Sequence, residues 1–209
     1  LFDTPPAAGE ERALVSAQSC TISPRVSLRQ VARSSLLRAP PRSTLVVIGN
    51  FDGVHRGHQA VIASAVDEAR SLGLAPVVLT FDPHPSVVLG KGTPSVLTTM
   101  ARRVELMERV APTLTVVVEP FTLELSELEP REFVDRLLLD DLGATAVLMG
   151  QNFCFGRGRK GDIALLCQLG KELGFRARAH ELEGDALGAF SSSRVRGALG
   201  SGDVGAAGQ

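Results

Sequence analysis

Two histidines three positions apart, His55 and His58, end the glycine-rich stretch Gly49-Asn-Phe-Asp-Gly-Val-His-Arg-Gly-His58. An apolar run precedes this stretch, and apolar residues at helical spacing follow it. A strand, a glycine loop and a helix start present backbone N–H groups and the positive end of a helix dipole, an arrangement that binds phosphate. Gly57 lets a ligand approach the backbone closely. Two imidazoles there can hold a polyphosphate and the charge that develops during its attack.

Two other interpretations of the histidine pair stay open at this point. Both histidines can be ordinary surface residues, although the flanking glycines favour a functional loop. An i, i+3 pair can also bind a metal ion, but no third ligand is evident nearby and the setting suits an anion better. We therefore predict a nucleotide-phosphate site and no protein-bound metal.

A second phosphate clamp is predicted at Ser191-Ser-Ser-Arg-Val-Arg196, where three hydroxyls and two guanidiniums begin a short helix. Hydroxyls, backbone N–H groups and an arginine fork together suit a phosphate group. By itself this run could be no more than a capped, solvated helix. Together with the histidine loop it predicts a triphosphate site.

Two further runs are candidates for the walls of a substrate pocket. Asp82-Pro-His-Pro85 predicts a rigid, extended turn, since each proline fixes its own φ and restrains the preceding residue. Gly150-Gln-Asn-Phe-Cys-Phe-Gly156 follows another apolar run. Gly156-Arg-Gly-Arg-Lys-Gly161 matches G-x-G-x-x-G, but it does not lie on a strand-to-helix turn, so we interpret it as a mobile basic loop. No GxxxxGK[ST] run occurs, which excludes a Walker-type kinase.

The elements that would position these runs alternate between strand and helix. The apolar runs are rich in Val and Leu on both faces, as in parallel strands covered by helices. The pattern predicts an α/β fold, a Rossmann-like doubly wound parallel sheet of about five strands, with the motifs gathered at the carboxyl ends of the strands. Expected strands are 44–49, 76–81, 114–118, 144–149 and 175–180, and expected helices are 57–72, 100–110, 130–142, 162–173 and 192–199.

Composition excludes several classes of protein. The formal net charge is −1, from 22 basic and 23 acidic residues, and the chain has no Trp or Tyr, which argues against a nucleic-acid partner. No apolar run approaches the roughly 20 residues that span a bilayer, so no membrane partner is expected. Three widely spaced cysteines suit reduced thiols in a cytoplasmic setting better than a disulfide framework.

The first 43 residues differ in composition from the rest of the chain. They are rich in Arg, Ser, Ala and Pro, and after Glu11 no acidic residue occurs until Asp52. We predict a poorly ordered extension with one short helix near 27–37. The same composition is typical of an organelle transit peptide, so a plastid or mitochondrial location remains the alternative to the cytoplasm.

The motifs together resemble the FMN adenylyltransferase (FAD synthetase) module of the bacterial bifunctional riboflavin kinase/FMN adenylyltransferase family. The resemblance covers about residues 44–207. It rests on the GNFDGVHxGH, FxPHP, NFxFG and SSTxIR runs of that family, which here occupy 49–58, 81–85, 152–156 and 191–196. Two conservative departures are Ser193 for the family's Thr and Val195 for its Ile. HxGH alone would indicate only the wider nucleotidyltransferase superfamily.

The resemblance implies that residues 44–209 transfer AMP from ATP to FMN with Mg²⁺, giving FAD and pyrophosphate. His55 and His58 would then stabilise the transferring phosphoryl group, and Arg196 would hold the leaving pyrophosphate. The remaining ATP contacts would come from Gly49, Asn50, Phe51, Gly57, Ser192 and Ser193, and the FMN contacts from Pro83, His84, Pro85 and Asn152. Attack of one phosphate on another needs no covalent nucleophile, so Cys154 is expected to have a packing role.

Two alternatives to FAD synthesis stay open. Another nucleotidyltransferase of the same fold would use phosphopantetheine, nicotinate mononucleotide or a phospho-alcohol as acceptor. A non-catalytic flavin- or nucleotide-binding module is the second, although such a module should have lost part of the phosphate site. The family continues into a riboflavin kinase β-barrel, which is not expected within these 209 residues.

Overall fold

The core of the molecule is a six-stranded sheet in which every neighbouring pair of strands is parallel. The computed structural model describes residues 29–37, 39–40, 42–92, 95–180, 183–186 and 188–208. The strand order is β1-β4-β3-β2-β5-β6. The strands are β1 (Arg29–Val31), β2 (Thr44–Ile48), β3 (Ala75–Asp82), β4 (Thr115–Pro120), β5 (Ala144–Gly150) and β6 (Arg176–His180).

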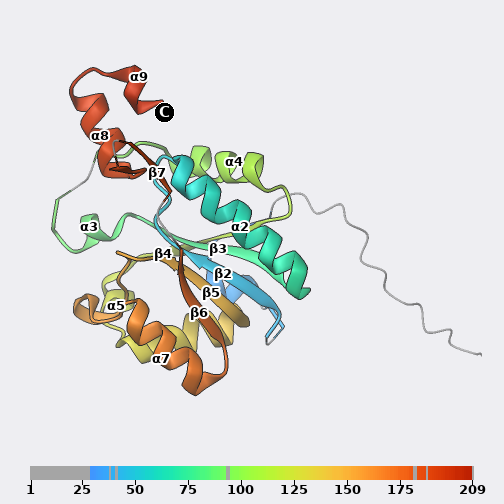
Figure 1. The fold of residues 1–209 in the computed structure, drawn as a ribbon. Coiled ribbons are helices and arrows are strands. Elements are labelled where there is room, and N and C mark those ends of the chain that lie inside the picture. Colours follow the sequence, from blue (N-terminus) through green and yellow to red (C-terminus); the bar gives the residue numbers. More distant parts are fainter. Residues whose placement is uncertain are drawn as a thin grey trace, which may run out of the picture.

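Helices cover both faces of the sheet, as Figure 1 shows. The longer α-helices are α2 (Arg56–Leu72), α4 (Met100–Val110), α7 (Ile163–Leu173) and α8 (Ser192–Gly200). The short elements are α1 (Ser34–Leu37), α3 (Pro85–Val88), α5 (Leu123–Ser126), α6 (Pro130–Phe133), the 3₁₀ turn η2 (Arg157–Arg159), α9 (Val204–Ala207) and the hairpin of β7 (Gly184–Asp185) and β8 (Gly188–Ala189). A π-helix, η1 (Val134–Asp141), continues α6.

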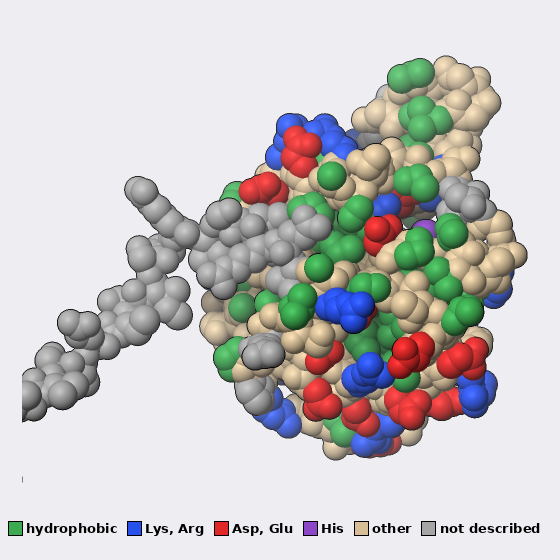
Figure 2. Space-filling model, turned by 180° about the vertical axis from the view of Figure 1, so that it is seen from behind, with side chains coloured by type: hydrophobic (Ala, Val, Ile, Leu, Met, Phe, Trp, Pro, Cys, Tyr) green, Lys and Arg blue, Asp and Glu red, His purple; other side chains and the backbone are tan. Residues whose placement is uncertain are grey.

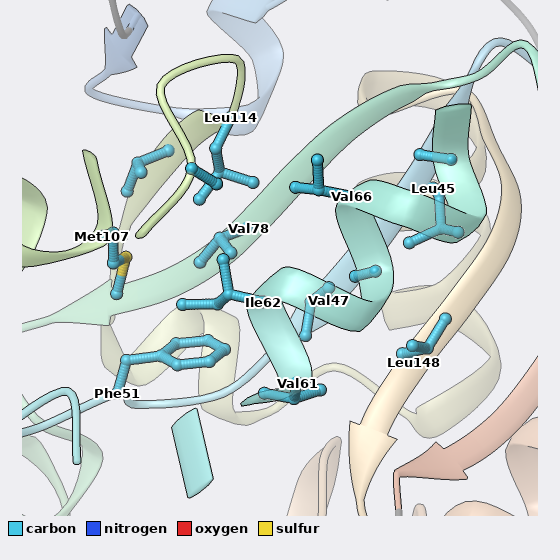
Figure 3. Packing of buried hydrophobic residues seen from close by; sticks show 14 of the residues in the cluster. Leu45, Val47, Phe51, Val61, Ile62, Val66, Val78, Met107, Leu114 and Leu148 are labelled. Carbon is cyan, nitrogen blue, oxygen red and sulfur yellow. The ribbon is translucent and has the colours of Figure 1, made fainter. Parts of the chain in front are cut away.

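The sheet separates two hydrophobic cores. Alternate residues of the fully buried strand β2 contribute to opposite sides, Leu45 and Val47 to one core and Val46 and Ile48 to the other. On the first side the strands pack against Ile62 of α2 and Met107 of α4, as seen in Figure 3. Burial on both faces explains why the strands are continuous apolar runs without alternation. The doubly wound parallel sheet predicted from the sequence is confirmed.

All five predicted strands are present, and the structure adds a sixth. β1 pairs with β4 at the edge of the sheet, within the segment that composition assigned to a poorly ordered extension. The helix expected near 27–37 is reduced to the four residues of α1, whose Ser34 N–H donates to Glu119 Oε2 at 2.5 Å. The prediction was therefore wrong for residues 29–37, because a three-residue edge strand carries no periodic signal of its own. Residues 1–28, including Cys20, lie outside the described part of the chain.

The order of the strands reverses beside β2. From β2 the chain continues to β3 and β4 on one side and later returns to β5 and β6 on the other. Parallel sheets of this kind bind ligands in the crevice beyond the carboxyl ends of the strands at such a switch point. The loops after β2 and β5 therefore flank the expected binding crevice, and α8 lies close to the start of α2 in Figure 1.

The surface carries both signs of charge. Figure 2 shows acidic and basic side chains intermixed over the lower part of one face, below hydrophobic side chains and the projecting α8–α9 segment. Within the residues described, no helix combines the length and the apolar character that crossing a membrane requires.

Candidate active site

The loop between β2 and α2 has an unusual backbone. Phe51 and Val54 both have positive φ, 52° and 41°, and neither is a glycine. Such angles are strained, above all for a β-branched residue, and persist only where the surroundings enforce them. Here both side chains are buried, 2% and 1% exposed, and Figure 3 shows the Phe51 ring packed in the core below Ile62. Core packing thus holds the loop in the shape that delivers His55 to the start of α2.

The two predicted catalytic histidines lie against each other. His55 is the N-cap of α2, and its Nδ1 accepts the backbone N–H of His58 at 3.4 Å. Their rings stack with centroids 3.6 Å apart, and Phe51 contacts the His58 ring at 5.1 Å. Because Nδ1 of His55 accepts, its neutral ring carries the proton on Nε2 and can donate it to a phosphate oxygen.

Both histidines are neutral at physiological pH. Burial lowers the pKa of His55 to about 4. The pKa of His58 is lowered to about 3, first by burial and then by the neighbouring His55 and Arg103, while Asp52 opposes the shift. A neutral imidazole costs less free energy to bury than a charged one and still has one N–H group. Each ring can therefore remain buried before an anion binds and then donate a hydrogen bond to it.

A cavity of about 340 Å³ opens beside the histidine loop. It is bounded by the loop after β2, the start of α2, the end of β5 and the start of α8. Among the predicted ATP residues, those lining it are Gly49, Asn50, Phe51, His55, Gly57, His58, Ser192 and Ser193. His180, Glu183 and Phe190 complete the wall and were not predicted. The fold thus assembles the wall of one cavity from segments that lie far apart in the chain.

A second cavity of about 380 Å³ adjoins the first. Its walls are largely aromatic, with Phe81, Phe121, Phe133, Phe153 and Phe155 among the lining residues. His84, Pro85, Asn152 and the partly exposed Cys154 also line it. Asn50, Asn152 and Phe153 line both cavities. A planar apolar group in the second cavity would therefore sit next to a phosphate in the first.

The turn after β3, predicted to be extended over residues 82–85, leads directly into a short helix. His84 is the N-cap of the short helix α3, accepting the Ser86 N–H on Nδ1 at 3.2 Å, and Pro85 is its first residue. Proline at a first helical position needs no N–H partner, which explains the local structure. Pro83 follows a cis peptide bond and is not among the residues lining either cavity.

The basic G-x-G-x-x-G segment is tied down at both ends. Phe155 and Gly161 exchange backbone hydrogen bonds of 2.9 Å, and the Arg157 N–H donates to Leu128 O at 2.7 Å. A Cβ at Gly156 would come within 2.9 Å of the Pro130 backbone. The segment is a closed turn against α6, which our interpretation as a mobile loop missed.

Arg196 does not face the first cavity as expected. Its Nη2 donates to Asp52 Oδ2 at 2.7 Å, and its Nε donates to the Ser95 carbonyl at 2.7 Å. The hydroxyl of Ser192, one turn earlier in α8, donates to the Asp52 carbonyl at 2.8 Å. The predicted anion clamp is thus anchored on Asp52, which lies within the glycine-rich motif at 49–58 but was not predicted as a site residue.

Asp52 and Arg103 are two further residues that the sequence-based prediction overlooked. Arg103 lies on the buried face of α4, where its Nη2 donates to Asp52 Oδ1 at 3.1 Å and its Nη1 to the Asn50 carbonyl at 2.8 Å. Burial alone would raise the pKa of Asp52, but backbone N–H groups of Leu97 and Thr98 and the two guanidiniums hold it below its ordinary value. An arginine among the apolar positions of an amphipathic helix was the available signal.

A match to a known protein family shows which family this chain belongs to. The sequence model of the FAD synthetase family matches residues 37–194, well over half of the chain. The chain belongs to the FAD synthetase family. Its histidine loop, phenylalanine-lined cavity and serine-rich helix all lie within or overlap the matched region.

Curated relatives of this FAD synthetase-family chain carry the name bifunctional riboflavin kinase/FMN adenylyltransferase. The *Pseudomonas fluorescens* protein is 37% identical over 173 residues, which cover 80% of this chain and 53% of the relative. The *Escherichia coli* K12 protein is 31% identical over 166 residues, covering 79% and 53%. The *Bacillus subtilis* protein is 32% identical over 172 residues, covering 81% and 53%. The chain thus spans about half the length of these relatives.

Among solved structures, one similar fold is described as a macrolide-efflux protein from *Streptococcus pneumoniae*. It is 25% identical to this chain, with a TM-score of 0.73, and the match covers 88% of this chain and 69% of that one. The likeness supports the arrangement of strands and helices described above.

Proposed function

We propose that this chain makes FAD by transferring AMP from ATP to FMN, with release of pyrophosphate. The observation that carries the proposal is the junction of the two cavities at Asn50, Asn152 and Phe153. One cavity presents imidazoles, hydroxyls and a helix start, and the other presents phenylalanine rings. FMN has a planar ring at one end and a phosphate at the other, so it can span the junction. Membership of the FAD synthetase family points to the same reaction.

ATP would occupy the cavity next to the histidine loop. His55 and His58 would donate to the oxygens of its α-phosphate, while Ser192, Ser193 and the start of α8 hold the rest of the triphosphate. At Gly49 and Gly57 no side chain separates the backbone from the cavity, so the nucleotide could approach the backbone closely. A Cβ at Gly57 would lie 3.3 Å from His55 Nδ1. FMN would lie in the second cavity against His84, Pro85 and Asn152. Arg196 does not line the ATP cavity and would act on the triphosphate from beyond its wall, through its positive charge.

The reaction needs positioning and charge stabilisation more than covalent help from the protein. A phosphate oxygen of FMN attacks the α-phosphorus of ATP and forms the new P–O bond. The bond from that phosphorus to the oxygen bridging to the β-phosphorus breaks, and pyrophosphate leaves with the electron pair. The imidazole N–H groups would stabilise negative charge on the α-phosphoryl oxygens during the transfer. Cys154 has no role in these steps.

Mg²⁺ would enter with the nucleotide. In the part of the chain that the structure describes, no cluster of three or more His, Cys, Asp or Glu could hold a metal ion. Asp52, whose carboxylate lies in the histidine loop, forms ion pairs with Arg103 and Arg196. We therefore propose that Mg²⁺ is carried mainly by phosphate oxygens and water, where it screens the triphosphate charge.

An assay of FAD formation tests the proposal. The chain is incubated with ATP, Mg²⁺ and FMN, and FAD is separated from FMN by chromatography. Parallel reactions replace FMN with phosphopantetheine, nicotinate mononucleotide or a phospho-alcohol. We expect FAD from FMN and no product from the other acceptors. Turnover of another acceptor without FAD formation would contradict the substrate, and no turnover with tight flavin binding would favour a non-catalytic module.

The proposal concerns the adenylyl transfer alone. The named relatives are bifunctional and about twice as long as the matched part, so riboflavin kinase activity is not proposed for residues 44–209. Of the cysteines, Cys154 and Cys167 are free thiols, which supports a reducing compartment such as the cytoplasm.

A further inference from the structure

Asp52 joins three separate segments of the chain through one buried carboxylate. Its side chain is 4% exposed and accepts the backbone N–H groups of Leu97 and Thr98 at 3.1–3.2 Å. It also accepts Nη2 of Arg103 at 3.1 Å and Nη2 of Arg196 at 2.7 Å. The loop after β2, the start of α4 and helix α8 therefore meet at this carboxylate.

The charges at this junction do not cancel. One carboxylate faces two guanidiniums, and the two differ in environment: the Arg103 side chain is 7% exposed, and the Arg196 side chain is 24% exposed. The Arg103 guanidinium donates hydrogen bonds to the Asp52 carboxylate and to the carbonyls of Asn50 and Thr98. The surplus positive charge therefore lies on the Arg196 side of the junction, on helix α8, whose first residues Ser192 and Ser193 line the first cavity.

The same residue also fixes the helix that carries the predicted phosphate donors. The Asp52 carbonyl accepts the Ser192 hydroxyl at 2.8 Å, and the carboxylate holds Arg196 one turn further along α8. Two anchors one turn apart determine both the position and the rotation of the helix start. His55, three positions after Asp52, belongs to the same loop, so the anchors also set the distance between the histidines and α8.

We propose that Asp52 is a positioning residue for ATP: through Arg196 and the Ser192 hydroxyl it fixes the start of α8, so that Ser192 and Ser193 meet the triphosphate opposite the two histidines. Asp52 itself touches neither substrate. The inference rests on the proposed function for the identity of the nucleotide. It predicts an effect on ATP that is separable from FMN, because the carboxylate contacts α8 and α4 and does not line the phenylalanine cavity.

The test compares Asp52→Asn, Arg196→Gln and the double variant with wild type. Affinities for a non-hydrolysable ATP analogue with Mg²⁺ and for FMN are measured separately by calorimetry, together with KM and kcat for FAD formation. Asp52→Asn should weaken analogue binding about tenfold, the usual scale for a charge-assisted contact, and change FMN affinity less than twofold. In the Arg196→Gln background, Asp52→Asn should weaken analogue binding by less than about a further threefold, because the effects of substitutions at contacting residues are not additive.

The chain offers a matched control. Glu105 also pairs with two arginines, Arg102 and Arg109, through contacts of 2.6 Å, but on the exposed face of α4. Glu105→Gln also removes a carboxylate that pairs with two arginines, but at a site that lines neither cavity. The affinities for the ATP analogue and for FMN should therefore stay unchanged. An equal loss of affinity for the ATP analogue and for FMN in Asp52→Asn would overturn the proposal. It would also be overturned if Asp52→Asn weakened analogue binding as strongly in the Arg196→Gln background as in wild type.

Two further results separate the possible failures. Should Asp52→Asn fail to fold, as judged by circular dichroism, Arg196→Gln decides, since it leaves Arg103 to pair with Asp52. Unchanged analogue affinity in Arg196→Gln would overturn the proposal. Should wild type bind the analogue but form no FAD, the proposed function fails, while the binding data still test the role of Asp52.

Discussion

The imidazole rings of His55 and His58 stack with their centroids 3.6 Å apart and their planes inclined by 23°. At this separation two charged rings would repel strongly in a buried site, and the lowered pKa values of both histidines show that the neutral pair is favoured. A neutral pair at the start of α2 and at the wall of the first cavity is suited to a phosphoryl group that gains negative charge as it is transferred.

Replacing His58 with alanine should remove most turnover while leaving flavin binding intact. The lost N–H donor stabilises charge that develops in the transition state, so kcat should fall about 10²- to 10³-fold. FMN affinity, measured by flavin fluorescence, should stay within twofold, because His58 does not line the phenylalanine cavity. The complementary variant is His84→Ala, which should weaken FMN binding more than it lowers kcat. Equal rates for wild type and His58→Ala would refute the assigned role.

Acid should destabilise the fold through these histidines. Folded-state pKa values of about 4 and 3 lie below the ordinary value of 6.5, so the unfolded chain takes up protons first as the pH falls. Stability is therefore complete above pH 6.5 and is lost progressively below it. For His58 alone the loss between pH 7 and pH 5 should be about 1–2 kcal/mol. Urea unfolding at both pH values tests this, and His58→Gln should lose less stability than wild type over the same interval.

Two phenylalanines should separate the substrates. Phe121 lines the second cavity and packs edge-on against Phe81 at 5.9 Å, whereas Phe190 lines the first cavity. Phe121→Ala should raise the KM for FMN about five- to tenfold through lost ring contacts and leave the KM for ATP unchanged. Phe190→Ala should do the reverse. Steady-state kinetics with each substrate varied in turn checks both variants, and a common effect on both substrates would disprove the division of the site.

Gly57→Ala should lower activity without lowering stability. A Cβ at this position would lie 3.3 Å from His55 Nδ1 and 3.4 Å from the Phe190 carbonyl, at the wall of the first cavity. Alanine nevertheless suits a helix better than glycine by about 0.5–1 kcal/mol. We expect a higher KM for ATP together with an unchanged or raised melting temperature.

Gly197→Ala is the matched control for this prediction. Gly197 also lies within a helix, α8, and a Cβ there would meet nothing within 4 Å. It should gain similar helix stability with no change in the KM for ATP. If Gly57→Ala binds ATP as well as Gly197→Ala does, close approach of the nucleotide to this backbone is ruled out.

Much of the fold, and many residues of the cavity beside the histidine loop, could be predicted from local sequence. The expected helix 100–110 coincides with α4, and the predicted strand 44–49 exceeds β2 by one residue. Apolar runs long enough to be buried on both faces, with glycines at their ends, leave few alternatives to parallel strands. The expected helix 130–142 is instead a short α-helix that continues as a π-helix. Apolar spacing indicates a helix there but does not reveal the change to i to i+5 bonding.

Local sequence was also enough to find the two histidines, the glycine loop and the serines of α8, since chemistry and helix-start signals coincide there. It could not show that Arg196 bonds to Asp52, 144 positions away, or that Arg103 reaches the same carboxylate from 51 positions away. Nor could it show that Arg29–Val31 extends the sheet by pairing with β4. These contacts depend on which elements the sheet brings together, and a buried carboxylate accepts whichever charged partners the fold places beside it.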